Sequence, residues 1–291
     1  MLGAALLPRL AERGHSVIRL VRPGGGAGVS AIPWDPERGL LEPSALRGVD
    51  AVVHLGGATI ASGRWTAARK QAIFDSRVRS TLLLAERIAA TPASDRPRAF
   101  VVASASGYYG NRGDSELLET SSAGEGFLPD VCRAWEDAAG PAARAGGRVA
   151  HPRLGMVLAR QGGALAAMLL PFRLGLGGPV GNGRQWWPWI SLPDAVEIFA
   201  RLVEDDSLSG PVNAVAPQTV TSAEFARALG RALHRPAVLP APALAVRLLL
   251  GEMAEGLLLA SARIRPDRLQ RAGFAFRHAR LDEALRAALA R

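Results

Sequence analysis

LGAALLPRLAERGHSVIRLVRP, residues 2–23, is the stretch of sequence that decides the fold. Its first half predicts an amphipathic helix over Leu2–Arg13, because the leucines at positions 2, 6, 7 and 10 share one face. Gly14 ends this helix, and Val17–Val21 predicts a strand, which Arg22-Pro23 closes. A helix that leads directly into a strand is typical of the second half of a nucleotide-binding βαβ unit, although an ordinary helix-first protein would begin in the same way.

The first half of such a unit consists of a strand and a glycine-rich turn. We expect both upstream of Met1, so the sequence predicts an N-terminal truncation of a dinucleotide-binding protein. Gly3 is the single glycine of a G-x-x-G-x-x-G turn that the chain could retain, where helix and strand approach closely. The backbone amides that normally bind pyrophosphate at a helix N-terminus would then be mostly missing.

Composition bounds the class of protein. The chain has 291 residues, of which 48% are hydrophobic, enough for one large domain or a domain with a small lobe. The net charge is +9, but Lys70 is the only lysine and the arginines are scattered without forming a basic block. Aromatic residues make up 5%, too few for base-stacking platforms. We therefore expect no nucleic-acid partner, while the oligomeric state stays open.

Cysteine and histidine usage excludes further classes of site. Cys132 is the only cysteine, so neither a disulfide framework nor a multi-cysteine zinc site is expected, and the five histidines lack metal-ligand spacing. No signal peptide is evident at the N-terminus. The most apolar late stretch, Ala237–Ala262, is interrupted by Arg247, Glu252 and Glu255, which is too much charge for a membrane span. We expect a cytoplasmic protein with no metal and no membrane partner.

Strands and helices alternate through the first two thirds of the chain. Predicted strands cover Val29–Trp34, Asp50–Leu55, Ala99–Ser104 and Arg148–Arg153, and predicted helices cover Arg64–Ala90, Gly126–Ala145 and Pro193–Glu204. This alternation predicts the α/β class, with a Rossmann-type doubly wound parallel sheet that lacks its first strand.

The pattern loosens from Gly162 onward, which predicts a smaller, mainly helical C-terminal lobe. This lobe is expected to draw on Gly162–Arg184, where Gly175–Arg184 must be loop, and on the chain from about Pro211 onward. We place the domain boundary after residue 235. The Rossmann-type domain then covers residues 1–235, with substrate-lobe insertions at about 162–185, and a small C-terminal domain covers 236–291.

Several residues are candidates for binding a nucleotide, because ligands of open α/β sheets lie beyond the carboxyl ends of the strands. Arg22 follows its strand where an acidic residue would bind the ribose of NAD, so an arginine there favours NADP over NAD, unless it is only a solvated surface residue. Leu55, Gly56 and Gly57 let the backbone approach a cofactor, or else make a tight turn. Arg77 falls on the apolar face of its helix and needs a partner, either a cofactor phosphate or a structural carboxylate.

Residues 104–110, SASGYYG, follow the Ala99–Ser104 strand at the same expected edge. Hydroxyl groups at a strand end can donate to a substrate carbonyl or hydroxyl, and a phenol can act as a general acid when its pKa is lowered. The serine and tyrosine side chains of this segment are therefore candidate catalytic groups, although a serine-rich turn would look similar.

This segment resembles the Ser-x-x-x-Tyr-Gly segment of the extended short-chain dehydrogenase/reductases, the sugar-epimerase superfamily. The chain is more closely similar to an atypical branch, the NAD(P)-dependent epimerase/dehydratase-like family with its own small C-terminal domain, members of which are also labelled cell-division inhibitor-like. The resemblance runs from Leu2 to the C-terminus. It rests on Arg64-Trp65-Thr66, Ser76-Arg77, Ser106-Gly107-Tyr108-Tyr109-Gly110, Trp135-Glu136, residues 170–179 (LPFRLGLGGP), Gly181-x-Gly183-x-Gln185, Trp189-Ile190 and residues 272–276 (AGFAF).

The chain departs from the superfamily at its catalytic pair, Tyr-x-x-x-Lys, where it has Cys132 and Glu136. A mechanism that depends on a tyrosinate assisted by a lysine is therefore in doubt. Our hypothesis is that any catalytic proton transfer uses Tyr108, Tyr109 or Glu136, and that Cys132 is a bystander. The superfamily serine corresponds to either Ser104 or Ser106.

The resemblance also assigns the remaining parts of the site. Gly155 and Met156 correspond to backbone that contacts the nicotinamide side of the cofactor, and Arg184, Gln185 and Trp186 are expected on the substrate side, unless the tryptophan serves only lobe packing. It implies an NADP-binding epimerase- or reductase-like oxidoreductase that acts on an unknown small molecule. The alternative is a non-catalytic NADP-binding sensor or interaction protein that has lost the Tyr/Lys pair.

Overall fold

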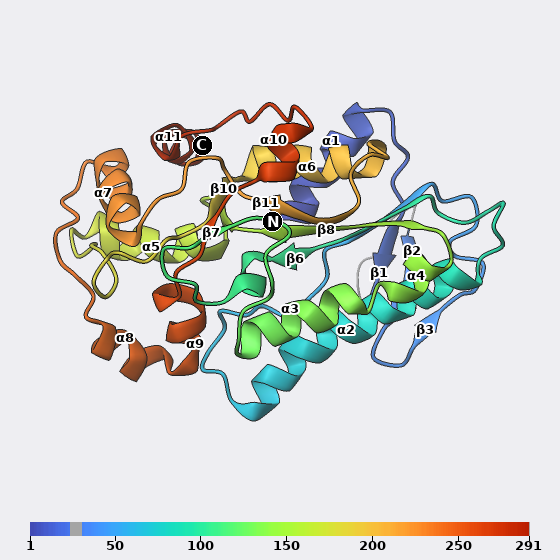
Figure 1. Ribbon diagram of the computed structural model, residues 1–291, viewed down its shortest axis with the longest axis horizontal. Coiled ribbons are helices and arrows are strands. Elements are labelled where there is room, and N and C mark those ends of the chain that lie inside the picture. The colour runs from blue at the N-terminus through green and yellow to red at the C-terminus, as the bar shows by residue number, and fades with distance from the viewer. Residues whose placement is uncertain (24–30, 291) are drawn as a thin grey trace.

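A four-stranded parallel ladder forms the centre of the computed structural model, which describes residues 1–23 and 31–290 (Figure 1). It consists of β4 (Ala51–His54), β5 (Ala99–Val102), β8 (Arg148–Leu154) and β11 (Gly210–Ala214) in the order β11-β8-β5-β4, and β6 (Ser104–Ala105) pairs with β8. All four residues of β5 are buried, as expected for an apolar strand covered on both faces. The α/β prediction is confirmed.

The N-terminal strands form a separate sheet. β1 (Arg19–Val21) pairs in parallel with β2 (Ala31–Asp35), which pairs with β3 (Leu40–Leu41) in antiparallel fashion. Residues 29 and 30 of the predicted Val29–Trp34 strand lie outside the described residues. Among the strands that the structure describes, no ladder joins β1 to β4. In a 3-2-1-4-5-6 sheet the first strand lies between these two, so the sheet is divided at the position predicted to lack a strand.

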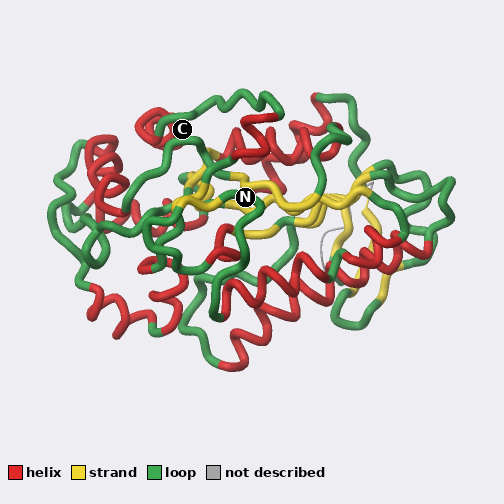
Figure 2. The backbone as a smooth tube through the Cα atoms, in the orientation of Figure 1, coloured by secondary structure: helices red, strands yellow, loops and turns green. Residues whose placement is uncertain are grey.

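Helices cover the two faces of the sheet (Figures 1 and 2). On one face α1 (Leu2–Glu12) packs against α6 (Leu192–Glu204), and on the other α2 (Ala67–Ala90) packs against α3 (Phe127–Asp137) and α4 (Gly140–Arg144). The single helix predicted over Gly126–Ala145 is thus two helices. Pro141 in the first turn of α4 explains the break, because proline has no N–H to continue the preceding helix.

The remaining elements include those of the predicted lobe. They are η1 (Ser106–Tyr109), β7 (Glu116–Leu117), β9 (Met156–Leu158), α5 (Gly163–Arg173), β10 (Trp189–Ser191), α7 (Ser222–Leu233), α8 (Ala243–Leu250), α9 (Glu252–Ala254), the π-turn η2 (Glu255–Leu259), β12 (Arg263–Ile264), α10 (Asp267–Arg271) and α11 (Leu281–Leu289). The prediction that the lobe resumes near Pro211 is wrong. Pro211 lies in β11, whose apolar residues pair in register with β8 and extend the central sheet.

Residues 175–184 form a loop, as predicted, and close packing explains their glycine content. A Cβ atom at Gly178 would lie 2.0 Å from the Leu239 carbonyl oxygen, and one at Gly177 would lie 2.5 Å from the Phe172 ring. The loop therefore lies directly on the segment that precedes α8. None of the described helices is long and apolar enough to cross a membrane.

Candidate active site

The carboxyl ends of the central strands bring the predicted catalytic residues to one edge of the sheet. Ser104 follows β5, and Arg153 lies in β8 directly opposite Ser104 in the β6–β8 register. Glu136 reaches this edge from α3, and η1 carries both tyrosines. Four of the five catalytic candidates, namely Ser104, Tyr108, Tyr109 and Glu136, meet around the side chain of Arg153.

Glu136 forms a bidentate ion pair with Arg153. Nε of Arg153 donates to Oε1 of Glu136 and Nη2 donates to Oε2, both over 2.8 Å, and the Ser104 hydroxyl donates to Oε1 over 2.6 Å. The side chains are only 3% exposed for Arg153 and 12% for Glu136. Burial lowers the pKa of Arg153, but the hydrogen bonds and charge of Glu136 outweigh it and raise that pKa above its ordinary value. Arg153 is therefore charged at neutral pH.

Tyr109 continues this network into the interior. Its hydroxyl accepts from Nη1 of Arg153 over 2.9 Å and donates to Oδ1 of Asn213 over 2.6 Å. The residue is fully buried, and burial raises the pKa of Tyr109 to about 12, although Arg153 and Asn213 oppose the shift. These contacts hold η1 against β8 and β11. As a general acid or base, Tyr109 stays a prediction.

Tyr108 has a different environment, although it is adjacent in sequence. It is half-buried, and its ring lies against the Arg153 guanidinium, whose Cζ atom is 3.3 Å from the ring centroid. Ser106, at the start of η1, is half-buried as well. Of the hydroxyl groups in residues 104–110, those of Ser106 and Tyr108 form no hydrogen bond with another described residue.

Cys132 and Lys70 take no part in the Arg153 network. The Cys132 thiol is 3.8 Å from the Ala105 carbonyl, and burial, with the charge of Glu136 adding to it, raises the pKa of Cys132 to about 12. Lys70 binds Glu252 at the edge of the lobe, with Nζ 2.7 Å from the carboxylate. Lys70 therefore lies outside the Arg153 network, and the cation that pairs with the Glu136 carboxylate is Arg153.

Arg77 lies under the loop that follows β4. Its Nη1 donates to the carbonyls of Ala58 (3.1 Å) and Ile73 (3.0 Å), and a Cβ atom on Gly57 would lie 3.0 Å from its Cζ. Burial lowers the pKa of Arg77. Among the described residues no carboxylate lies within ion-pair distance of it. Of the two partners considered for Arg77, the structural carboxylate is thus absent from the described part of the chain.

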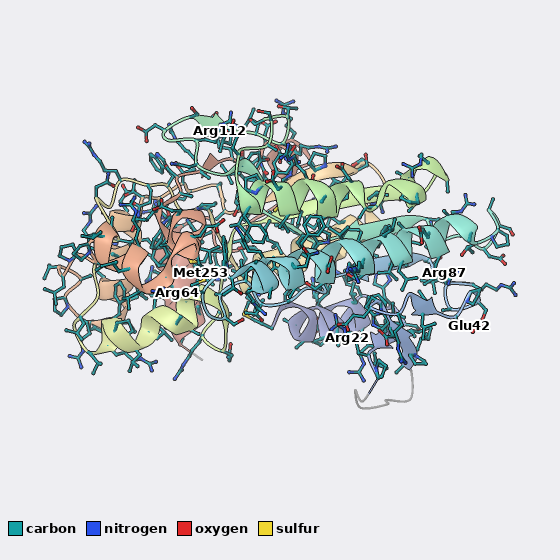
Figure 3. The ribbon with its side chains drawn as sticks, turned by 90° about the horizontal axis from the view of Figure 1, so that it is seen from below. Arg22, Glu42, Arg64, Arg87, Arg112 and Met253 are labelled. Atoms are coloured by element: carbon teal, nitrogen blue, oxygen red, sulfur yellow. The ribbon has the colours of Figure 1, made fainter. Side chains whose placement is uncertain are left out.

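The other residues of this edge are brought together by β1, β4 and α1. His54 is buried with Nε2 2.8 Å from the Ser80 hydroxyl, and burial, together with the charges of Arg22 and Arg77, lowers its pKa to about 4. Arg22 is exposed at the end of β1, beside α1 (Figure 3). The electrostatic effect of Arg22 on His54 indicates that the ends of β1 and β4 are close.

The glycines of this edge permit close approaches. A Cβ atom on Gly56 would lie 2.7 Å from Cε1 of His54, so the turn needs glycine for the ring to fit. Gly3 of α1 faces Leu55, whose Cδ1 atom would lie 3.5 Å from a Cβ atom there. This is an ordinary van der Waals distance, so the contact does not require glycine, and the role predicted for Gly3 stays a prediction.

Gly155 and Met156 lie where β8 passes into β9. The Gly155 amide donates to the Ala214 carbonyl, and a Cβ atom on Gly155 would lie 2.9 Å from the Pro188 carbonyl oxygen. The Met156 amide donates to that same carbonyl over 2.8 Å. Close packing against Pro188, the residue before β10, therefore explains why position 155 is a glycine. Contact of Gly155 or Met156 with a cofactor stays a prediction.

The three substrate-side candidates have unlike environments. Arg184 is exposed. Gln185 is buried, and its Nε2 donates to the carbonyls of Val180 and Leu258, both over 3.0 Å, which ties the glycine-rich loop to the π-turn η2. Trp186 is half-buried and donates from its indole N–H to Asp114 over 2.8 Å. Gln185 thus has a clear packing role, and substrate contact stays a prediction for all three.

Sequence reasoning did not assign a role to three polar residues of the network. Besides Arg153, these are Asn213, which receives the Tyr109 hydroxyl, and Glu119, whose Oε1 accepts the backbone amide of Asn213 over 3.1 Å. The signal for Arg153 and Asn213 was a single polar residue within each otherwise apolar strand end. Such a residue needs a buried partner.

The fold and the residues at the carboxyl edge define a Rossmann-type nucleotide-binding protein. Residues 1–127 match the model of the NAD dependent epimerase/dehydratase family, and residues 241–288 match the domain of unknown function DUF1731. An epimerase family protein of Mycobacterium bovis is 44% identical over 285 residues, covering 98% of this chain and 93% of that protein. The chain therefore belongs to the NAD-dependent epimerase/dehydratase family, which confirms the resemblance.

A human relative supports the same family assignment. The human epimerase family protein SDR39U1 is 37% identical over 292 residues, covering 98% of this chain and 95% of that protein. A crystal structure of human SDR39U1, isoform 2, with NADPH superposes with a TM-score of 0.89 at 34% identity, covering 99% of this chain and 95% of that chain. This chain is thus an NAD(P)-dependent, oxidoreductase-like member of the family.

Proposed function

We propose that this chain binds NADP(H) at the carboxyl ends of β1 and β4 and acts as an epimerase or reductase on a small molecule. The observation that carries the proposal is Arg77, a half-buried cation beneath Gly57 that has carbonyl partners and no carboxylate among the described residues. Partial burial of an arginine without a counter-charge costs free energy, and a phosphate group supplies the counter-charge in charge-assisted, bidentate geometry. The family membership and the NADPH-bound human relative support the same reading.

The choice of NADP over NAD rests on Arg22. Its place at the end of β1 is where an acidic residue would bind the 2′-hydroxyl of NAD, and an arginine there suits a 2′-phosphate. The exposure of Arg22 leaves its guanidinium free to pair. Leu55, Gly56 and Gly57 would hold the adjacent part of the nucleotide through the backbone, with Gly155 and Met156 on the nicotinamide side.

A bound nicotinamide supplies the hydride donor or acceptor, and the protein must move a proton. We assign that proton to Tyr108, with Ser106 as hydrogen-bond donor to the substrate oxygen. The Ser104 hydroxyl is committed to Glu136, and the Tyr109 hydroxyl is buried between Arg153 and Asn213, so these groups hold the site in position. The Arg153 guanidinium lies against the Tyr108 ring and fixes its position.

Calorimetric titration of NADPH and NADH into the protein tests cofactor binding. We expect NADPH to bind more tightly, Arg22→Asp to weaken NADPH alone, and Arg77→Gln to weaken both cofactors by about ten- to a hundredfold. Arg79→Gln is the matched control, because Arg79 lies on the same helix but is exposed and pairs with Asp75. Equal affinity of the parent for both cofactors would reject NADP selectivity, and an Arg77 variant no weaker than the control would reject the phosphate site.

Turnover tests the chemistry. In a screen of NADPH oxidation against carbonyl compounds and nucleotide sugars, Tyr108→Phe should lower kcat by about a hundredfold or more, the scale of a lost general acid. Tyr109→Phe should instead lower the unfolding midpoint and leave more of kcat intact. The opposite ranking would return the proton to Tyr109. Tight NADPH binding with no turnover of any substrate would favour the sensor alternative.

A further inference from the structure

Large apolar side chains are concentrated on the solvent side of two segments of the lobe. Of the twelve large hydrophobic side chains that are exposed among the described residues, eight lie in residues 170–176 and 238–249. They are Leu170, Leu174, Leu176, Val238, Leu239, Leu244, Leu248 and Leu249, and we call them the leucine face. Single exposed leucines need no explanation, but a concentration of this kind marks an interaction site.

The two segments lie side by side. The Leu239 amide donates to the Gly177 carbonyl over 3.2 Å, and the Ala241 amide donates to the Pro179 carbonyl over 2.9 Å. α8 follows directly, and its end is held by Arg64, which donates to the Leu249 carbonyl over 3.1 Å. In Figure 1 the end of α5, the link before α8 and α8 itself lie together at the left-hand end of the molecule.

Both helices of this face are apolar on two sides. α5 turns Leu165, Leu169 and Phe172 into the core and leaves Leu170 exposed, and α8 buries Val246 while Leu244 and Leu248 are exposed. Each contains one charged residue, an arginine. A helix that is hydrophobic all round is normally buried on all sides, so the outer side of each lacks a partner here.

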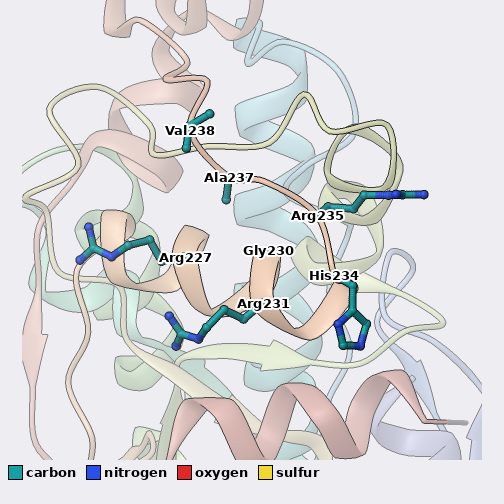
Figure 4. Close-up of a pocket in the computed structure, with 7 residues that line it drawn as sticks. All are labelled: Arg227, Gly230, Arg231, His234, Arg235, Ala237 and Val238. Atoms are coloured by element: carbon teal, nitrogen blue, oxygen red, sulfur yellow. The ribbon is translucent and has the colours of Figure 1, made fainter.

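The charged residues within the two segments of the leucine face are all arginines. Residues 138–193 and 225–251 contain no aspartate or glutamate. Arg173 and Arg227 have no acidic partner among the described residues. A surface hollow of about 510 Å³ adjoins the face and is lined by Val238 together with Arg227, Arg231 and Arg235 (Figure 4). Acidic residues from neighbouring elements reach two arginines of these segments: Arg231 pairs with Asp282 and Arg247 pairs with Glu255.

We propose that the leucine face docks on an anionic phospholipid surface, with the leucines entering the headgroup boundary and the arginines contacting lipid phosphates. This combination of apolar and cationic side chains is what interfacial binding to anionic lipid requires. A second copy of the chain fits less well, because a two-fold contact would bring the arginines of this face against each other. Partner proteins usually bind through aromatic anchors, and the exposed side chains of the face include none.

This docking needs no spanning helix, so it is compatible with the described helices. It departs from the expectation of no membrane partner, which rested on the lack of a spanning segment. Exposed leucines could not be recognised from the sequence, since their spacing is equally typical of a buried helix.

Co-sedimentation with large unilamellar vesicles tests the proposal. The full chain should bind vesicles of phosphatidylcholine and phosphatidylglycerol but not phosphatidylcholine alone, and added NaCl should weaken binding. Leu174→Glu with Leu248→Glu should reduce partitioning by about tenfold or more. Arg173→Glu should reduce it by at least about fivefold. Leu40→Glu is the matched control, because Leu40 is 57% exposed on β3, away from the face, and this variant should bind like the parent.

Three results would overturn the proposal. One is equal partitioning to neutral and anionic vesicles, and another is an equal loss of binding in Leu40→Glu. The third is sedimentation velocity that shows a dimer which the paired leucine substitutions dissociate, with no vesicle binding by the parent. That result would assign the face to a second copy of the chain. Unfolding midpoints of the variants identify any loss that comes from misfolding.

Discussion

Replacing Glu136 by glutamine separates the two charges of the network without changing its shape. The amide keeps one oxygen that can accept from Arg153 and Ser104. In the parent protein Nη2 of Arg153 donates to Oε2 of Glu136 over 2.8 Å, and in the variant it would face the amide nitrogen, which cannot accept. Because Arg153 is 3% exposed, water cannot replace the lost carboxylate. The substitution therefore leaves a buried cation without a counter-ion.

The size of the expected loss in the free energy of unfolding is set by the burial of Arg153 rather than by the strength of the ion pair. Removing one partner of a buried pair costs about 3–5 kcal/mol, because the other charge stays desolvated. We expect Glu136→Gln to lower the free energy of unfolding by about 3 kcal/mol, since one acceptor remains. For a chain of this length that corresponds to a decrease in Tm of about 6–12 °C.

Urea unfolding followed by tryptophan fluorescence measures this loss, and Trp135 lies next to the substitution. Glu252→Gln is the matched control: its partner Lys70 and the carboxylate are 33% and 46% exposed, so breaking that pair should cost less than about 1 kcal/mol. Glu136→Met with Arg153→Met removes both charges and should recover more than half of the loss.

Two results would refute this reasoning. A cost for Glu136→Gln no larger than that of the exposed control would mean that water or another group already screens Arg153. A double variant less stable than Glu136→Gln would mean that Arg153 stabilises the fold mainly through its other contacts, such as the Tyr109 hydroxyl.

Three further predictions concern groups outside the ion pair. Burial lowers the pKa of His54 from 6.5 to about 4, so the stability that its neutral form contributes is present above pH 6.5 and lost as the pH falls toward 4. Urea unfolding should show a loss of about 3 kcal/mol in the free energy of unfolding over this range, and the loss should be absent in His54→Asn. Burial raises the pKa of Cys132 from 9.0 to about 12, so alkylation by iodoacetamide at neutral pH should be about a thousandfold slower in the folded chain than in urea, and comparable rates would contradict its burial. Gly178→Ala forces a Cβ atom to within 2.0 Å of the Leu239 carbonyl oxygen and should lower the free energy of unfolding by about 3 kcal/mol, whereas Gly162→Ala, with its nearest contact at 3.6 Å, should change it little in the same assay.

Periodicity and strand-end rules predicted the framework because both depend on local patterns. The apolar run that ends at Ser104 predicted β5, and the alternation predicted a parallel sheet whose carboxyl edge collects Ser104, Tyr108 and Arg77. β11 was missed, because Gly210–Ala214 is short and contains proline and asparagine, residues that are depleted in strands. Pairing with β8 outweighs that local preference.

The partners within the site could not be predicted, because they depend on tertiary packing. Glu136 lies 17 residues from Arg153, and Tyr109 lies 104 residues from Asn213. The place of Gln185 in a glycine-rich motif predicts a substrate contact, which stays a prediction, but it does not predict that the amide joins two backbone carbonyls across the lobe. The sequence signature of a polar residue is the same whether it contacts a substrate or packs against the backbone.

The two adjacent tyrosines illustrate how one short turn can bury one phenol and leave the next one half-buried. η1 is a 3-10 turn, and successive side chains in such a turn point about 120° apart, so Tyr108 and Tyr109 differ in burial although both contact Arg153. Two glycines fix the orientation of the turn: a Cβ atom on Gly107 would lie 3.3 Å from Leu128, and Gly110 has a φ of 61° that favours glycine. In this orientation Tyr109 points inward, where burial raises its pKa to about 12, and Tyr108 stays half-buried against Arg153. Cys132 and Glu136 stand where the superfamily has tyrosine and lysine, and under the proposed function the half-buried phenol of Tyr108, beside the buried Arg153, would carry out the proton transfer instead.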